Sequence, residues 1–85
     1  MTFFAFFEAA DLLRKRGYLE KETGYRRRTF YEFNTWDFLT SDMAKKFDIE
    51  YDKNGLVEKL VYTQYFFGTT TFKEINDLEE LKASL

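Results

Sequence analysis

Residues 47–67 read FDIEYDKNGLVEKLVYTQYFF, and this stretch carries the clearest fold signal in the chain. Two segments rich in aromatic and β-branched residues flank the dipeptide Asn54-Gly55. An Asn-Gly pair in this position favours a two-residue type I′ turn, because both residues tolerate a positive φ. The stretch therefore predicts an antiparallel β-hairpin.

The predicted turn sets the pairing register of this hairpin. It gathers the apolar residues of both segments on one face and puts Glu50 opposite Lys59 on the other, where their opposite charges attract. Because the second segment is the longer one, we expect Tyr65 to Phe67 to pair elsewhere. The opposed residues are Lys53 with Leu56, Tyr51 with Glu58, Glu50 with Lys59, Ile49 with Leu60 and Phe47 with Tyr62.

The segment after this hairpin has a helical pattern. Thr71 and Glu74 have the spacing of a capping box, in which a hydroxyl and a carboxylate satisfy free amides at a helix start. An apolar stripe at helical spacing follows. Its members are Ile75, Leu78, Leu81 and Leu85. The sequence therefore predicts a C-terminal helix that begins near Thr71.

Two further elements are expected upstream of the hairpin. Residues 35–46 place apolar side chains at helical spacing and predict a short helix. Residues 18–34 lose the helical period and gain aromatic residues and threonine, so we expect strands near 18–22 and 25–33 around Thr23-Gly24.

The N-terminal residues 2–16 form the third expected helix. Thr2 is a suitable N-cap, Gly17 is placed to end the helix, and the cations of the last turn complement the helix dipole. The resulting order is helix, hairpin, helix, hairpin, helix. We expect one small α+β domain over residues 1–85, with an antiparallel sheet of about four strands covered by helices.

The composition narrows the function classes. The 85 residues include no His and no Cys, which excludes disulfides, thiolate nucleophiles, Ser-His relays and sites built on imidazole or thiolate ligands. The apolar run at the N-terminus breaks at Glu8, before the length of a signal peptide or a membrane span. We expect a cytoplasmic protein that is not an enzyme and has no cofactor or membrane span.

One acidic string has a superficial likeness to a calcium loop. Glu50, Asp52 and Asn54-Gly55 alternate as such ligands do, but the twelfth position counted from Glu50 is Val61 and the flanks predict strands. A solvated strand face explains the acids better than calcium binding. A row of carboxylates that imitates phosphates is the other alternative. We therefore predict no metal site.

The arginines are strongly concentrated. All five lie between Arg14 and Arg28, and the flanking tyrosines have the chemistry that contacts phosphates, bases and protein surfaces. The simpler explanation is that Arg14 and Arg16 complement the helix dipole, while Arg26 to Arg28 pair with Glu20, Glu22 or the acidic later half of the chain. The residues expected at a partner-binding patch are Arg14, Arg16, Tyr25, Arg26, Arg27, Arg28 and Tyr31.

Aromatic residues are the second functional signal. Eleven Phe, six Tyr and one Trp are more ring surface than a small domain can bury, so some rings should be exposed for contact. On the first helix, Phe4 falls within the polar stripe and Phe7 at its margin. We expect Phe4 and Phe7 to contact a partner. Core packing is the alternative, although Phe4 does not easily join the inward-facing residues of this helix.

These features favour a protein-binding module without catalytic activity. A small chain of this kind fits a stoichiometric inhibitor or modulator of a host protein or nucleoprotein complex, as phages and other mobile elements deploy against host defence. The first alternative is a nucleic-acid-binding protein that uses the patch between Arg14 and Arg28, although the net charge of −2 counts against it. The second is a homo-oligomer subunit.

Overall fold

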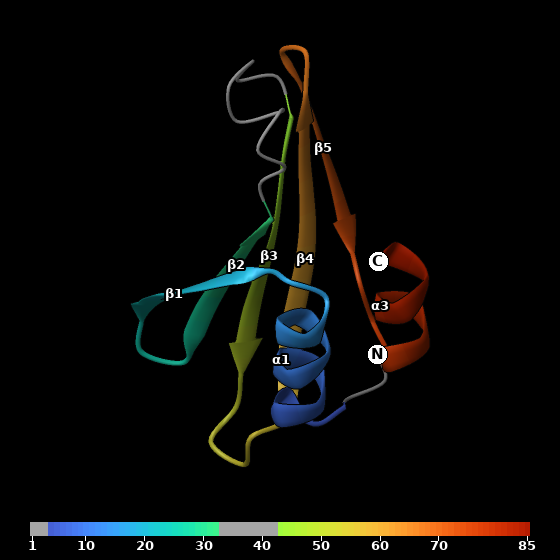
Figure 1. Cartoon of the computed structure of the whole chain (residues 1–85). Coiled ribbons are helices and arrows are strands. Elements are labelled where there is room, and N and C mark those ends of the chain that lie inside the picture. The colour runs from blue at the N-terminus through green and yellow to red at the C-terminus, as the bar shows by residue number, and fades with distance from the viewer. Residues whose placement is uncertain (1–3, 33–42) are drawn as a thin grey trace.

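The computed structural model describes residues 4–32 and 43–85. Five antiparallel strands form one sheet whose order, β1-β2-β3-β4-β5, repeats the chain order, and two helices accompany it within these ranges (Figure 1). The α+β class is confirmed at this level, with one strand more than predicted. The elements are α1 (Phe6–Lys15), β1 (Leu19–Gly24), β2 (Arg27–Glu32), β3 (Met43–Tyr51), β4 (Val57–Phe66), β5 (Thr69–Glu74) and α3 (Leu78–Ser84).

Helix α1 ends as its sequence predicts. Gly17 has a φ of +88°, and the amides of Gly17 and Tyr18 donate to the carbonyls of Arg14 and Leu13 at 3.0 and 3.2 Å. This is the Schellman arrangement that a C-terminal glycine favours. The N-cap is Ala5, whose side chain makes no capping bond, and Thr2 lies outside the described residues.

The hairpin of β3 and β4 keeps much of the predicted register through a longer turn. The Asp52 amide donates to the Leu56 carbonyl at 2.8 Å, so the loop has three residues and Gly55 alone takes the positive φ. Tyr51 pairs with Val57 instead of Glu58. A bulge at Glu58 then restores the register, and Glu50 faces Lys59 as predicted.

The Asp52 side chain explains why the three-residue loop forms instead of the predicted two-residue turn. Its Oδ1 accepts hydrogen bonds from the amides of Asn54 and Leu56 at 2.8 and 3.1 Å. A two-residue type I′ turn would not offer both amides to this carboxylate. The same carboxylate belongs to the calcium-like string, and it is used by the backbone of its own turn.

The hairpin of β1 and β2 turns one dipeptide later than predicted. Thr23 and Gly24 belong to β1, with a bulge between Glu22 and Gly24, and the turn residues are Tyr25 and Arg26. The strands therefore run over Leu19–Gly24 and Arg27–Glu32.

Two predicted helical segments are strands instead. Residues 43–46 open β3, so the predicted helix over 35–46 is wrong there, and the rest of it lies outside the described residues. Thr71 to Glu74 belong to β5, so the predicted capping box is wrong. Helix α3 starts after Asp77, which accepts a hydrogen bond from the Glu80 amide at 2.8 Å, while Glu80 accepts one from the Asn76 amide at 2.8 Å. The reciprocal cap therefore lies six residues after Thr71.

The core lies between the helices and one face of the sheet. Side chains from α1 and α3 pack against the sheet residues that share this face, and Tyr51 and Tyr62 pack at its margin. Its fully buried members with the largest side chains are Leu13, Phe30, Phe47, Ile49, Leu60, Ile75 and Leu81. In the described ranges, neither helix has the length and apolar run needed to cross a bilayer.

Candidate protein-binding surface

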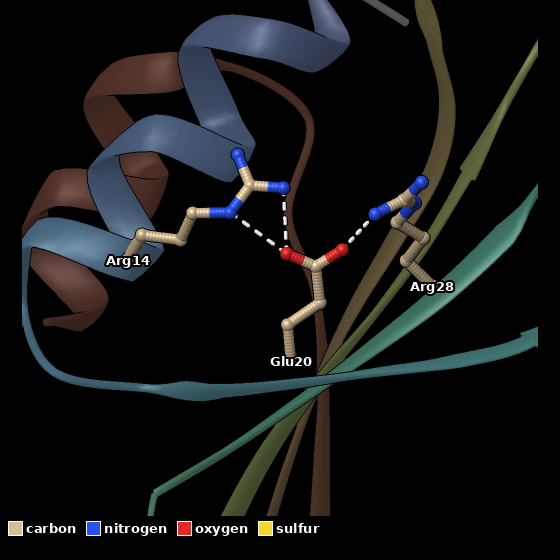
Figure 2. A network of polar contacts seen from close by, with 3 residues as sticks. All are labelled: Arg14, Glu20 and Arg28. Carbon is tan, nitrogen blue, oxygen red and sulfur yellow. Dashed lines mark hydrogen bonds and ion pairs between the residues drawn. The ribbon is translucent and has the colours of Figure 1, made fainter.

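The two arginine clusters meet at one carboxylate. Arg14 on α1 and Arg28 on β2 both form ion pairs with Glu20 on β1, and Arg14 Nε lies 2.7 Å from Glu20 Oε2 (Figure 2). The Arg28 guanidinium also lies 5.9 Å from the ring centroid of Phe6. These two arginines therefore join α1 to the sheet. The simpler explanation expects the pair with Glu20 for Arg28 but not for Arg14.

Arg27 lies on the opposite face of the sheet, because neighbouring residues of a strand point to opposite sides. Its guanidinium is 3.6 Å from Asp48 Oδ1, and Lys46 Nζ is 3.5 Å from Asp48 Oδ2. The Thr29 hydroxyl donates to the same carboxylate at 2.6 Å. Arg27 is thus part of a mixed-charge cluster on this face.

The remaining expected residues are scattered. Tyr31 is half-buried and pairs with Lys46, so it shares the face of Arg27. Arg16 is exposed at the end of α1. Phe4 packs against the core, and its carbonyl accepts the Val57 amide at 2.7 Å. The sequence-predicted patch is therefore divided among several surfaces.

Three of the expected residues do come together. Phe7, Tyr25 and Arg26 line a groove of about 440 Å³ at the end of the molecule where α1 begins and two hairpins turn. Phe7 is 75% exposed and Tyr25 90% exposed. We call this groove the base groove; its lining is Phe7, Tyr25, Arg26, Tyr51, Asp52, Lys53, Asn54 and Gly55.

Backbone hydrogen bonds join the walls of the base groove. The Phe6 amide donates to the Gly55 carbonyl at 2.8 Å, which fixes the start of α1 to the loop of β3 and β4. The Tyr51 amide donates to the Arg26 carbonyl at 3.2 Å, which fixes the other hairpin turn to the end of β3. The groove is therefore built on short turns that are tied to each other.

The base groove combines aromatic rings with free positive charge. The Arg26 guanidinium lies 5.4 Å from the ring centroid of Tyr25, a cation–π contact. Within residues 4–32 and 43–85, neither Arg26 nor Lys53 forms an ion pair, and Asp52 is engaged by its own turn. The groove thus offers apolar ring surface beside two cations, Arg26 and Lys53, and one carboxylate, Asp52, so that positive charge is in excess.

Arg26 has an unfavourable backbone conformation. Its φ is +61°, in the left-handed region where a side chain is strained and glycine is not. Phe67, at the turn of β4 and β5, is the other described residue besides glycine with positive φ, at +46°. Both residues lie at hairpin turns, where glycine or asparagine would fit with less strain.

Sequence reasoning found part of the base groove and missed the rest. Phe7, Tyr25 and Arg26 were expected at a partner surface, but Tyr51 and Lys53 were assigned only to a hairpin. The Asn54-Gly55 turn was the available signal, since residues beside a turn are exposed and lie near other turns at the same sheet end. That signal does not say which turns are neighbours.

A buried tyrosine lies away from the groove. Burial raises the pKa of the Tyr18 hydroxyl well above its usual range, and the nearby Glu32 carboxylate, which accepts its hydrogen bond, adds to the effect. Burial also raises the pKa of Tyr62, again with Glu32 nearby. Both hydroxyls therefore stay protonated, as expected for side chains that pack in the core or at its margin.

Comparisons with known proteins add no precedent for this arrangement. The chain matches no protein-family model, and no curated protein or solved structure gives a match. The base groove and the surfaces of the sheet are therefore the features from which a function can be inferred.

Proposed function

We propose that this chain is a non-catalytic protein-binding module that docks a partner segment in the base groove. The observation that carries the proposal is Arg26, a large charged residue at positive φ, stacked on an exposed tyrosine within the groove. Strained backbone is retained where the side chain is needed, and such positions cluster at binding sites. Tyr, Phe and Arg are also the residues that protein interfaces favour.

The chemistry of the base groove defines the segment that fits it. Rings of Phe7, Tyr25 and Tyr51 supply apolar contact, while Arg26 and Lys53 attract carboxylates. An acidic partner segment with an apolar or aromatic anchor satisfies both requirements. The role that follows is stoichiometric inhibition or modulation of a host protein or nucleoprotein complex in the cytoplasm, in the manner of phage proteins.

The test is capture of a partner from host lysate by the tagged chain, followed by affinity measurement with the purified partner. Tyr25→Ala and Arg26→Glu should each weaken binding by at least tenfold, because they remove an exposed ring or reverse a groove charge. Arg16→Glu is the matched control, since Arg16 is an exposed arginine outside the groove. Equal loss with Arg16→Glu, or no loss with either groove variant, contradicts the proposal.

Direct nucleic-acid binding is the second candidate function, and one surface favours it. A depression of about 320 Å³ on the sheet face opposite α1 and α3 is lined by Arg27, Lys46 and Lys59 with the ring of Phe72. Asp48 and Glu50 line the same depression and neutralise much of its charge. Binding to bare DNA or RNA that weakens steeply with salt and is lost in Arg27→Glu would select this function.

A further inference from the structure

The two edges of the sheet differ in how they are protected. Edge strand β1 carries Glu20, Lys21 and Glu22 in succession and a bulge before Gly24, which are features that discourage pairing with another chain. Edge strand β5 reads TTTFKE, pairs with β4 without a bulge, and is exposed at all six residues. Within the described residues, β5 has a sheet neighbour on one side only (Figure 1).

The alternation of the antiparallel ladder shows which backbone groups of β5 are free. The Ile75 amide donates to the Leu60 carbonyl on β4 at 2.9 Å, so the residue at 75 directs its hydrogen-bonding groups inward. Because consecutive residues alternate, Thr70, Phe72 and Glu74 direct their N–H and C=O groups away from β4. These three residues form a row of open donors and acceptors.

We propose that β5 pairs antiparallel with β5 of a second copy of this chain, with Phe72 opposite Phe72 of the second copy. The two copies are then related by a two-fold axis perpendicular to the sheet, which keeps each side chain on the same sheet face in both copies. At this axis, one residue of β5 must therefore lie opposite the same residue of the second copy. Centring on Phe72 uses all three outward residues of both strands and makes about six backbone hydrogen bonds. Centring on Thr71 or Lys73 makes only about four.

The side chains suit this register. Phe72 is 71% exposed, and the pairing sets two such rings side by side at the centre. Thr70 then opposes Glu74, and Thr71 opposes Lys73, so each charged residue meets a threonine and no like charges face each other. Self-pairing is therefore favoured by backbone, ring and charge pattern together.

The protected edge limits the assembly. Since β1 carries a bulge and alternating charges, the ten-stranded sheet formed by two copies ends in two protected edges. Growth therefore stops at a closed dimer rather than a fibre. The base groove lies on α1 and on two turns that exclude β5, so both copies keep it open.

Light scattering over a concentration series tests the dimer, with a doubled mass as the expected result. Phe72→Pro should return the mass to that of a monomer, because it removes an outward N–H and the central ring but no bond to β4. The folded state of this variant is checked by circular dichroism. A wild-type monomer at the highest concentration overturns the proposal, as does a Phe72→Pro variant that is folded and still dimeric.

Cross-linking tests the register, and the chain helps because it has no native cysteine. A mixture of Thr71→Cys and Lys73→Cys proteins should form mixed disulfides on mild oxidation, since this non-hydrogen-bonded pair brings Cα atoms to about 4.5 Å. Each variant alone should cross-link at least tenfold less. Preferential cross-linking of Thr71→Cys with itself contradicts the register.

The dimer and the proposed function fail in different ways. If Tyr25→Ala no longer captures the partner but still forms the dimer, the base groove binds the partner independently of the pairing of β5. A monomeric wild type whose partner capture is lost in Phe72→Pro would show that β5 accepts a strand of the partner, which overturns self-pairing.

Discussion

Arg26 and Phe67 are residues with large side chains in a backbone conformation that favours glycine. Their φ angles of +61° and +46° each cost about 1 to 2 kcal/mol relative to glycine in the folded state. Gly55, at the turn of β3 and β4, and Gly68, which follows Phe67 in the same turn, take positive φ without this strain. Two exposed turns therefore carry large side chains that lower the stability of the folded state. This is expected where the side chains are needed to bind a partner.

The first prediction concerns this strain. Arg26→Gly should raise the free energy of unfolding by up to about 1 kcal/mol, because relief of strain exceeds the added entropy of the unfolded glycine. The same variant should weaken partner binding. Urea denaturation measures the first effect, and Arg27→Gly, within β2, is the control that should destabilise. A loss of stability in Arg26→Gly would mean that the arginine side chain supports the fold.

The second prediction follows from the raised pKa of Tyr18. Since the folded pKa lies above the unfolded value of about 10, its contribution to stability is complete below pH 10. Above pH 10 the unfolded chain releases the proton first, so the free energy of unfolding should fall by about 1 kcal/mol per pH unit.

Thermal denaturation between pH 8 and pH 11 measures this slope. Tyr18→Phe should flatten it, because the variant has no proton to release at this position. Tyr62→Phe should flatten it less, since Tyr62 is more exposed than Tyr18. Identical slopes in the wild type and in Tyr18→Phe would show that other groups govern the alkaline range.

At the scale of elements, α3 depends on its ends because it has only seven residues. Helices of this length are not stable alone, so the cap at Asp77 and the buried Leu81 must hold it. Asp77→Ala should lower the free energy of unfolding by about 1 kcal/mol, as for other N-cap removals. Glu79→Ala is the matched control, because Glu79 is an exposed first-turn acid outside the reciprocal cap.

Amide hydrogen exchange adds a local readout for this cap. Residues 80 to 84 should lose protection in Asp77→Ala before the strands do, since the cap acts on α3 alone. If neither the exchange rate in α3 nor the free energy of unfolding changes in Asp77→Ala, packing of Leu81 is sufficient to keep α3 folded without the cap.

The elements also show how far the sequence predicts the fold. The Asn54-Gly55 hairpin could be predicted because two period-2 segments flank it, and the bulge at Glu58 preserved most of its register. The strand β5 could not, because Thr71 and Glu74 match a capping box as well as Asp77 and Glu80 do. Residues 71–74 form a strand because they pair with the long strand β4, so the helix starts after Asp77. This pairing is a tertiary interaction that the local sequence does not reveal.

The base groove was predictable to a smaller degree. Exposed rings and arginines were expected from composition, and Phe7, Tyr25 and Arg26 are in the groove. The pairing of Arg28 with Glu20 was among the expected alternatives. The pairing of Arg14 with the same carboxylate could not be inferred, because it depends on how α1 crosses the sheet. Local patterns specify residues near turns, whereas the packing angle of a helix brings distant residues together.

At the scale of the whole molecule, Glu20 links three elements. It joins α1 and β2 through β1 (Figure 2). Its side chain is only 22% exposed. Glu20→Gln should lower the free energy of unfolding by about 1 kcal/mol, because two guanidinium groups lose their anion at a partly exposed site. Glu22→Gln, an exposed acid on the same strand, should have less than half this effect in urea titrations.

The order of the strands has a consequence for how the chain reaches its native state. Each of three neighbouring strand pairs, β1-β2, β3-β4 and β4-β5, is closed by a loop of a few residues, so these hairpins can zip up from their turns with little loss of chain entropy. Local pairing of this kind favours faster refolding than a sheet of the same size with crossover connections. The chain also has no proline, so the slow isomerisation phase common in denatured proteins should be missing from stopped-flow traces.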